Sequence, residues 1–183
     1  MPKDLKTERM TLRSLRPSDA GLMTLYLSDD RVAKMLALVP FPYPPGAAEA
    51  YIEKILAGQH PTEVWAMDAT QIGSSELVGL VSFKPEQRSL HYWVGPPFWN
   101  TGMASEAVEA VAHHLLEDRG VPELIASIFI DNPASEQVLR KLGFTPSRDH
   151  EAFCVARDQT VAVRDYALTL SALRSAGHSA TTA

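Results

Sequence analysis

The chain has 183 residues, of which 45% are hydrophobic, and this size and composition predict one compact α/β domain with a full core. The formal net charge of -5 argues against a nucleic-acid-binding protein, which normally presents a basic face. The single cysteine, Cys154, excludes an internal disulfide and a cysteine-rich metal site, and its strand-like surroundings predict a small buried residue. No apolar run approaches the ~18 residues of a membrane span, and residues 1–10 contain no signal-peptide core, so we expect a cytoplasmic protein without a membrane partner.

The first part of the chain predicts a strand, two helices and three strands. Residues 10–15 alternate in hydrophobicity like a strand, and residues 16–29 follow with helical spacing. A proline-rich loop then precedes a helix that is expected from about Ala47 to Gly58. Three β-rich segments separated by turn residues predict an antiparallel meander at 63–69, 76–83 and 89–95.

The second part predicts two further helices with strands between and after them. A helix with one apolar stripe is expected over residues 102–118, and residues 123–130 are nearly all apolar, as in a strand buried on both faces. The next helix begins at a capping residue, Asn132, and ends before Gly143.

Two strands then close the domain, at 151–156 and 161–170. The small polar residues 175–183 predict a flexible tail that follows a single domain at 1–174. Together these elements predict a mixed sheet with helices on both faces.

The helix at 102–118 begins in a turn of small residues, where Gly102, Ala104 and Ser105 have almost no side chain. A helix N-terminus offers unpaired N–H groups and a partial positive charge, which suit a phosphate group. The turn matches neither a P-loop nor a dinucleotide-binding fingerprint. Small residues there equally suit close packing of the helix against the sheet, and the residues alone leave both interpretations open.

Two separated segments, LHYWVGPPFWNTGMASEAVEAV and DNPASEQVLRKLGF, fall in a specific order on these expected elements. With them, the chain resembles the GNAT superfamily of N-acetyltransferases, and in particular the branch of ribosomal-protein N-terminal (alanine/serine) acetyltransferases. The turn of that branch reads Trp-x-x-Gly-x-Ala, which Trp99, Gly102 and Ala104 match. The resemblance covers most of the chain and implies a GNAT-like mixed, mostly antiparallel sheet with a splayed pair of strands.

The resemblance also implies where acetyl-CoA binds. Backbone N–H groups of the turn are expected to hold its pyrophosphate, and the turn consists of Asn100, Thr101, Gly102, Met103, Ala104 and Ser105. The strand carrying Trp93 and Val94 is expected to splay from the strand ending at Ile130, with the pantetheine arm between them. Thr101 departs from the pattern, because relatives often carry Lys or Arg there.

Two residues of the second motif are candidates for contact with the cofactor. Asn132 stands where the family's asparagine hydrogen-bonds the pantetheine, although the same side chain serves equally as a helix cap. Ser135 stands where a serine of this branch approaches the thiol, and it is the candidate to hydrogen-bond or protonate the thiolate. The alternative is an inert serine in the first turn. The tyrosine that many relatives use one turn later is replaced by Leu139.

The general base is less well defined by the residues. Relatives often carry a glutamate where this chain has Ser89, and His91 follows two residues later on the same strand face. A histidine with an ordinary pKa near 6.5 suits a general base. The alternatives are a structural His91 and a relay through ordered water. The adjacent His113 and His114 point apart on a helix, so no metal site is expected.

The resemblance places the acceptor site near the first two helices, so Phe41 and Tyr43 are expected either to line it or to pack onto the core. The leading hypothesis is acetylation of a primary amine, with a protein N-terminal α-amine first. A small-molecule amine, such as a polyamine or an aminoglycoside, is the alternative. A catalytically silent acyl-CoA-binding domain is a second class, favoured by the residues found at 89, 101 and 139. A monomer or a homodimer fits either class.

Overall fold

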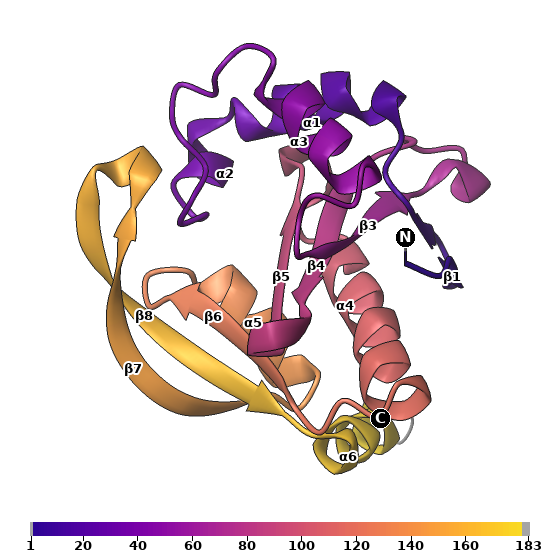
Figure 1. The fold of residues 1–183 in the computed structure, drawn as a ribbon. Coiled ribbons are helices and arrows are strands. Elements are labelled where there is room, and N and C mark those ends of the chain that lie inside the picture. The colour runs from indigo at the N-terminus through magenta and orange to yellow at the C-terminus, as the bar shows by residue number, and fades with distance from the viewer. Residues whose placement is uncertain (1, 181–183) are drawn as a thin grey trace.

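A computed structural model describes residues 2–180 and contains one eight-stranded sheet in the order β1-β2-β3-β4-β5-β6-β8-β7. Neighbouring strands are antiparallel except β5 and β6, which are parallel. The expected mixed, mostly antiparallel sheet is therefore confirmed (Figure 1). The strands are β1 (Leu5–Lys6), β2 (Thr11–Arg13), β3 (Glu63–Asp68), β4 (Gly79–Lys84), β5 (Ser89–Val94), β6 (Leu124–Phe129), β7 (Thr145–Cys154) and β8 (Gln159–Leu168).

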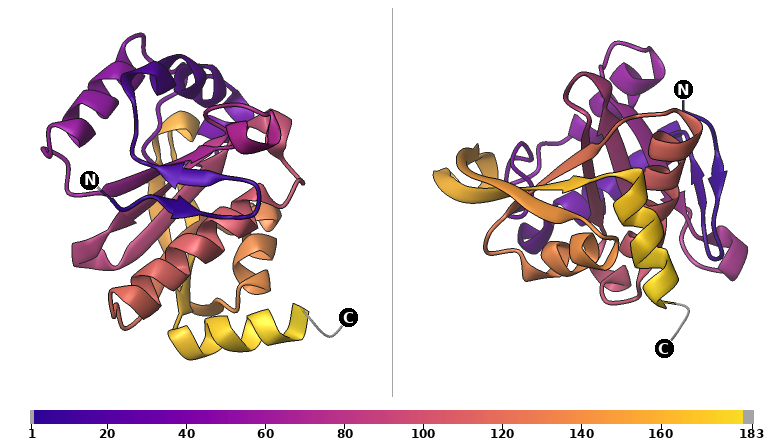
Figure 2. Two further views of the ribbon diagram at one scale, coloured as in Figure 1. Left: turned by 90° about the vertical axis from the view of Figure 1, so that its right-hand side faces the viewer. Right: turned by 90° about the horizontal axis from the view of Figure 1, so that it is seen from below.

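Helices cover both faces of this sheet, as Figures 1 and 2 show. One core cluster joins the sheet to α4, α5 and α6, and the other joins it to α1, α2 and α3. Residues such as Val111 from α4 and Ile52 from α3 are almost fully buried on these opposite faces. The helices are α1 (Ala20–Leu27), α2 (Asp30–Ala33), α3 (Ala47–Leu56), α4 (Met103–His113), α5 (Pro133–Lys141) and α6 (Leu170–Ala180). A π-helical turn, His114–Asp118, continues α4.

The two parallel strands separate along their length. Their register contains one pair, Ser89 with Ile125, and the N–H of Ile125 donates to the carbonyl of Arg88 at 2.9 Å. Beyond this pair β5 continues along β4, whereas β6 continues along β8. The splayed strand pair is therefore confirmed, and it opens toward the C-terminal ends of both strands (Figure 1).

Three elements were not predicted, namely β1, α2 and α6. The flexible tail predicted from residue 175 overlaps α6, which continues to Ala180, and its flexibility stays a prediction. The buried Leu173 of α6 packs on the core beside α4 and α5, and this contact stabilises the helix. The remaining predicted tail residues, 181–183, lie outside the described part of the chain.

Strand β7 begins at Thr145, six residues earlier than predicted from hydrophobic alternation. The extra residues are almost all exposed and polar, since β7 is an edge strand of the sheet. Cys154 at its end is fully buried, as predicted. None of the helices within residues 2–180 is long and apolar enough to cross a membrane.

Candidate active site

The N-terminus of α4 is a cradle of backbone N–H groups. Gly102 is its N-cap residue, and no described side chain caps the helix. The N–H of Glu106 donates to the carbonyl of Gly102 at 3.1 Å, so the N–H groups of Met103, Ala104 and Ser105 precede the first helical hydrogen bond. Because the side chains of Met103 and Ser105 are buried, backbone forms the open end of this helix.

The structure also explains why residue 102 is glycine. Its φ of 80° lies in the left-handed region, which side chains other than glycine rarely adopt. A Cβ added there would meet one atom within 4 Å, Nη2 of Arg9 at 3.3 Å. Close packing of helix and sheet is therefore the wrong explanation for Gly102, since the sheet is not within reach. Asn100 also has a positive φ, of 61°. The turn before α4 therefore has a left-handed backbone conformation at two residues, Asn100 and Gly102.

Arg9 brings a positive charge to this cradle from the turn between β1 and β2. Its Nε donates to the carboxylate of Glu106 at 2.7 Å, and its Nη1 donates to the carbonyl of Thr101 at 2.7 Å. Burial acts to raise the pKa of Glu106, but hydrogen bonds from Thr7 and Arg9 outweigh it and lower that pKa. The guanidinium thus lies beside Thr101, where relatives often carry the basic residue themselves. Sequence reasoning missed Arg9, because no local pattern links it to a helix 97 residues later.

Because β5 and β6 separate, most of the β5 backbone has no register partner on β6 within the described residues. The N–H of Gly95 donates to the carbonyl of Val78 at 2.8 Å. Backbone groups alternate in direction along a strand, so the odd-numbered residues of β5 direct their N–H and C=O groups toward β4. The backbone groups of Tyr92 and Val94 therefore face the gap, beyond the last pair with β6. The carbonyl of Val94 accepts from Nε1 of Trp99 at 2.7 Å, so the turn is tied to the end of the strand. The N–H of Val94 remains directed into the gap.

Trp93 is placed differently from Val94. Its backbone faces β4, and its side chain lies on the α1–α3 face, where it packs edge-on against Tyr26 with ring centroids 6.3 Å apart. Of the two strand residues predicted to contact acetyl-CoA, Val94 is the one that offers its backbone to the gap.

Helix α5 carries the next two predicted residues. Oδ1 of Asn132 accepts from the N–H of Ser135 at 3.1 Å, so the capping interaction of Asn132 is confirmed. The hydroxyl of Tyr92 donates to the carbonyl of Ser135 at 3.2 Å and ties the start of α5 to β5. Burial raises the pKa of Tyr92 to about 12, which keeps this donor protonated. The Ser135 side chain is half-buried and interacts with Tyr92, since a hydrogen bond from Ser135 acts against the rise in the pKa of Tyr92.

His91 lies on the α1–α3 face of β5, next to the point where the strands separate. Its Nε2 is 3.0 Å from the hydroxyl of the buried Ser89. Burial lowers the pKa of His91 to about 4, and the charge of Lys84 acts in the same direction. At neutral pH the ring is uncharged, and so weak a base holds a proton poorly.

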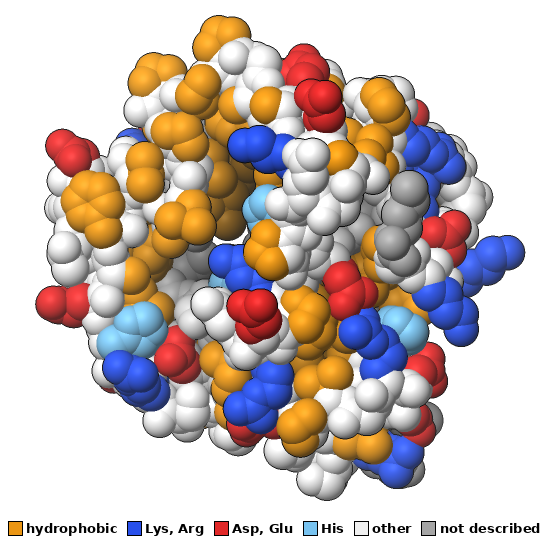
Figure 3. All heavy atoms as spheres, in the orientation of Figure 1, with side chains coloured by type: hydrophobic (Ala, Val, Ile, Leu, Met, Phe, Trp, Pro, Cys, Tyr) orange, Lys and Arg blue, Asp and Glu red, His pale blue; other side chains and the backbone are white. Residues whose placement is uncertain are grey.

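The two predicted acceptor-side aromatic residues differ in environment. Phe41 is exposed, whereas Tyr43 is half-buried against the core cluster of α1 and α3, and this burial raises its pKa. Figure 3 shows a hollow on this side of the molecule, with hydrophobic side chains around it, in the region that Figure 1 shows between α2, β5 and β6.

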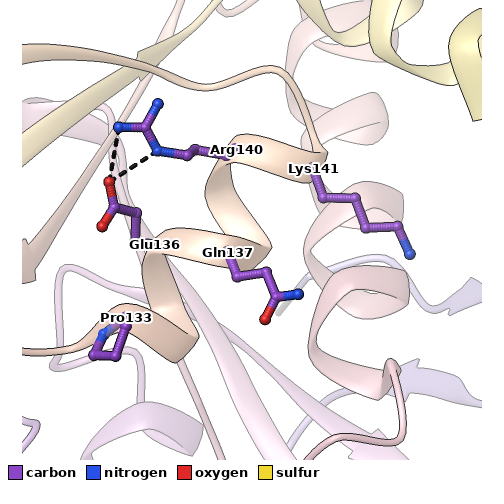
Figure 4. Close-up of a pocket in the computed structure, with 5 residues that line it drawn as sticks. All are labelled: Pro133, Glu136, Gln137, Arg140 and Lys141. Carbon is purple, nitrogen blue, oxygen red and sulfur yellow. Dashed lines mark hydrogen bonds and ion pairs between the residues drawn. The ribbon is translucent and has the colours of Figure 1, made fainter.

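The remaining features are the two adjacent histidines and a depression along α5. His113 and His114 each contact a carboxylate four residues later, and no group of three or more potential metal ligands occurs among the described residues. A shallow depression on the outer side of α5 is lined by Pro133, Glu136, Gln137, Arg140 and Lys141, with Arg140 bound to Glu136 at 2.8 Å (Figure 4).

Comparison with known proteins identifies the family. Residues 9–145 match the family model of the acetyltransferase (GNAT) domain. The chain is 26% identical over 146 residues to the uncharacterized N-acetyltransferase YoaA of Bacillus subtilis (strain 168), which covers 76% of this chain and 81% of that protein. It is 30% identical over 74 residues to the ribosomal-protein-serine acetyltransferase of Escherichia coli (strain K12), which covers 38% of this chain and 41% of that protein.

The fold agrees with this assignment. RimL, a ribosomal L7/L12 alpha-N-protein acetyltransferase solved in complex with coenzyme A, has a TM-score of 0.77 at 16% identity. The similarity covers 93% of this chain and 99% of that one. Since the family model also spans well over half of the sequence, this chain belongs to the GNAT acetyltransferase family and is an N-acetyltransferase.

Proposed function

We propose that the enzyme transfers the acetyl group of acetyl-CoA to a protein N-terminal α-amine. The observation that carries the proposal is the N-terminus of α4, which no described side chain caps. It follows the C-terminal end of β5, where β5 and β6 have separated. The bound coenzyme would supply the acetyl thioester, and the residues of this chain would bind it and direct the amine to it.

The backbone N–H groups from Asn100 to Ser105 would hold the pyrophosphate, with the guanidinium of Arg9 adding charge beside them. Two observations support this arrangement: the helix end is free of a capping side chain, and Nη2 of Arg9 lies 3.3 Å from where a Cβ of residue 102 would be. The charge missing at Thr101 would in this way be replaced from another part of the chain.

The pantetheine arm would lie in the gap between β5 and β6 and hydrogen-bond to β5 as an added strand would. The N–H of Val94 would donate to the thioester carbonyl and stabilise the oxyanion that forms when the amine attacks. Asn132 would contact the arm through its amide nitrogen, since its Oδ1 already serves as the cap. Trp93 would border the acceptor side rather than the arm.

The amine nitrogen would attack the carbonyl carbon, after which the carbon–sulfur bond breaks and the thiolate leaves. Ser135 would hydrogen-bond that thiolate, which its place at the start of α5, beside Tyr92 of β5, supports. Because the pKa of His91 is lowered to about 4, we assign removal of the amine proton to a water relay, with His91 and Ser89 as hydrogen-bonding groups along it.

The similarity to a ribosomal-protein-serine acetyltransferase and to RimL supports a protein N-terminus as the acceptor. Phe41 and Tyr43 would contact the acceptor peptide from the loop before α3. Location in the cytoplasm, and a monomer or homodimer as the active form, complete the proposal.

Release of free thiol from acetyl-CoA tests the proposal across matched acceptors. The panel is a peptide with a free N-terminal serine or alanine, the same peptide with a blocked N-terminus and an internal lysine, a polyamine and an aminoglycoside. We expect turnover with the free N-terminus and none with the blocked peptide. Turnover restricted to the small amines would replace the proposed acceptor. Saturable acetyl-CoA binding without turnover on any acceptor would instead indicate an acyl-CoA-binding domain.

A further inference from the structure

A polar cluster lies on β6, β8 and β7, the three strands beyond the gap. Ser127 and Asp165 are register partners on β6 and β8, and the Ser127 hydroxyl donates to Oδ1 of Asp165 at 2.6 Å. Nε2 of His150, on β7, lies 3.0 Å from the same oxygen. Oδ1 of Asp165 therefore holds two partners, while its Oδ2 has no hydrogen bond within residues 2–180. The side chain of Asp165 is 17% exposed, and the two contacts of Oδ1 hold the carboxylate in place.

Other charges near the cluster leave this carboxylate oxygen uncommitted. Arg164 and Asp149 neighbour the cluster in sequence, but they lie on the opposite face of the hairpin and pair with each other at 2.7 Å. Arg148 is the register partner of Asp165 on β7 and is exposed, and no ion pair among the described residues joins it to Asp165.

The cluster faces the same side of the sheet as His91. Leu124 and Ala126 of β6 pack toward α4 and α5, so Ser127 between Ala126 and Ile128 points to the opposite face, toward α1–α3. Ser127 lies two residues beyond Ile125, just as His91 lies two residues beyond Ser89. The two residues therefore occupy the same register on either side of the gap, and Asp165 is one strand further, ~4.8 Å on.

Alkyl amines are mainly ammonium ions at neutral pH, because their pKa values lie near or above 8. A carboxylate oxygen without a partner among residues 2–180, one strand beyond the gap and on the side away from α4, suits such an ion. We propose that Asp165 binds the ammonium group of the acceptor, with Ser127 and His150 as positioning residues that hold the carboxylate. The inference rests on the proposed function and narrows its acceptor to a cationic primary amine.

The test compares Asp165→Asn with Asp149→Asn, which removes a carboxylate from the other face of the same hairpin. Each variant is assayed with two acceptors: a peptide with a free N-terminus and an aromatic amine, which is uncharged at pH 7. We expect Asp165→Asn to raise KM for the peptide at least tenfold, while its kcat/KM for the aromatic amine and its Kd for acetyl-CoA stay within about twofold of wild type. Ser127→Ala should also raise KM for the peptide without affecting the aromatic amine, but by a smaller factor than Asp165→Asn. The Asp149→Asn variant should match wild type with both acceptors.

Two results would overturn the inference. An unchanged KM for the peptide would mean that Asp165 does not contact the acceptor. Equal losses with both acceptors, together with a lower Tm, would mean that the cluster only stabilises the sheet. Calorimetric titration of the peptide into the coenzyme A complex distinguishes the role of Asp165 from the proposed acetyl transfer. If wild type binds the peptide without turnover and Asp165→Asn does not bind it, the proposed function fails while the role of Asp165 stands.

Discussion

Gly102→Ala should weaken acetyl-CoA binding far more than it weakens the fold. The new methyl group would stand 3.3 Å from Nη2 of Arg9, at the open end of α4. If that space belongs to a phosphate, at least one charge-assisted hydrogen bond is lost, at ~1.5–3 kcal/mol. The dissociation constant then rises roughly ten- to hundredfold.

The substitution also strains the backbone, and the chain offers a matched control for that strain. Gly46 is the N-cap of α3 with a φ of 76°, against 80° at Gly102, and a Cβ added there meets nothing within 4 Å. An L-residue in this conformation costs ~1–2 kcal/mol. Gly46→Ala and Gly102→Ala should therefore lower Tm by similar amounts, a few degrees for a chain of this size.

Calorimetric titration of acetyl-CoA, with thermal melts of both variants, provides the measurement. We expect wild-type affinity in Gly46→Ala and a loss of affinity in Gly102→Ala. Unchanged affinity in Gly102→Ala would refute the reasoning, because the N-terminus of α4 would then not hold the coenzyme. A loss of the same size in both variants would attribute the effect to strain.

The remaining predictions concern His91, Ser135 and Asn132. Since the folded-state pKa of His91 is about 4 and the unfolded value is about 6.5, the unfolded chain takes up the proton first as the pH falls. The free energy of unfolding should therefore decrease between pH 6.5 and 4, by ~1–3 kcal/mol from this group, and His91→Gln should flatten that slope in denaturant titrations. A break in log(kcat/KM) above pH 6.5 should survive the same substitution, and its disappearance would identify His91 as the base after all. Ser135→Ala should lower kcat roughly ten- to hundredfold while the Kd for acetyl-CoA changes little, and an unchanged kcat would show that the hydroxyl does not assist the thiolate. Asn132→Ala should lower the free energy of unfolding by ~1 kcal/mol in denaturant titrations through loss of the cap, and no loss would contradict a stabilising role for the bond to Ser135.

Much of the fold could be predicted because its signals are local. Helix α5 is bounded by a capping Asn132 and by Gly143, and the structure keeps both features within one residue of the expected ends. The splayed pair β5–β6 was expected from the family resemblance alone, since no residue pattern in either strand specifies its partner. Strand β7 was misjudged because its residues are mostly polar, and helix α6 was missed because its residues are mainly small or polar. The neighbours that these elements pack or pair with stabilise them.

The sequence by itself determined the elements and the short-range devices: the uncapped turn at Gly102, the cap at Asn132 and the alternation that puts His91 and Val94 on different sides of β5. Only the tertiary structure decided which residues far apart in the sequence come into contact. Arg9 reaches Glu106 across 97 positions, and Ser127 reaches Asp165 across 38. The same holds for the pKa of His91, which sequence reasoning left at its ordinary value and burial lowers to about 4. The physical reason is that hydrophobic period and turn chemistry act over a few residues, whereas burial and charge pairing depend on the order of strands in the sheet.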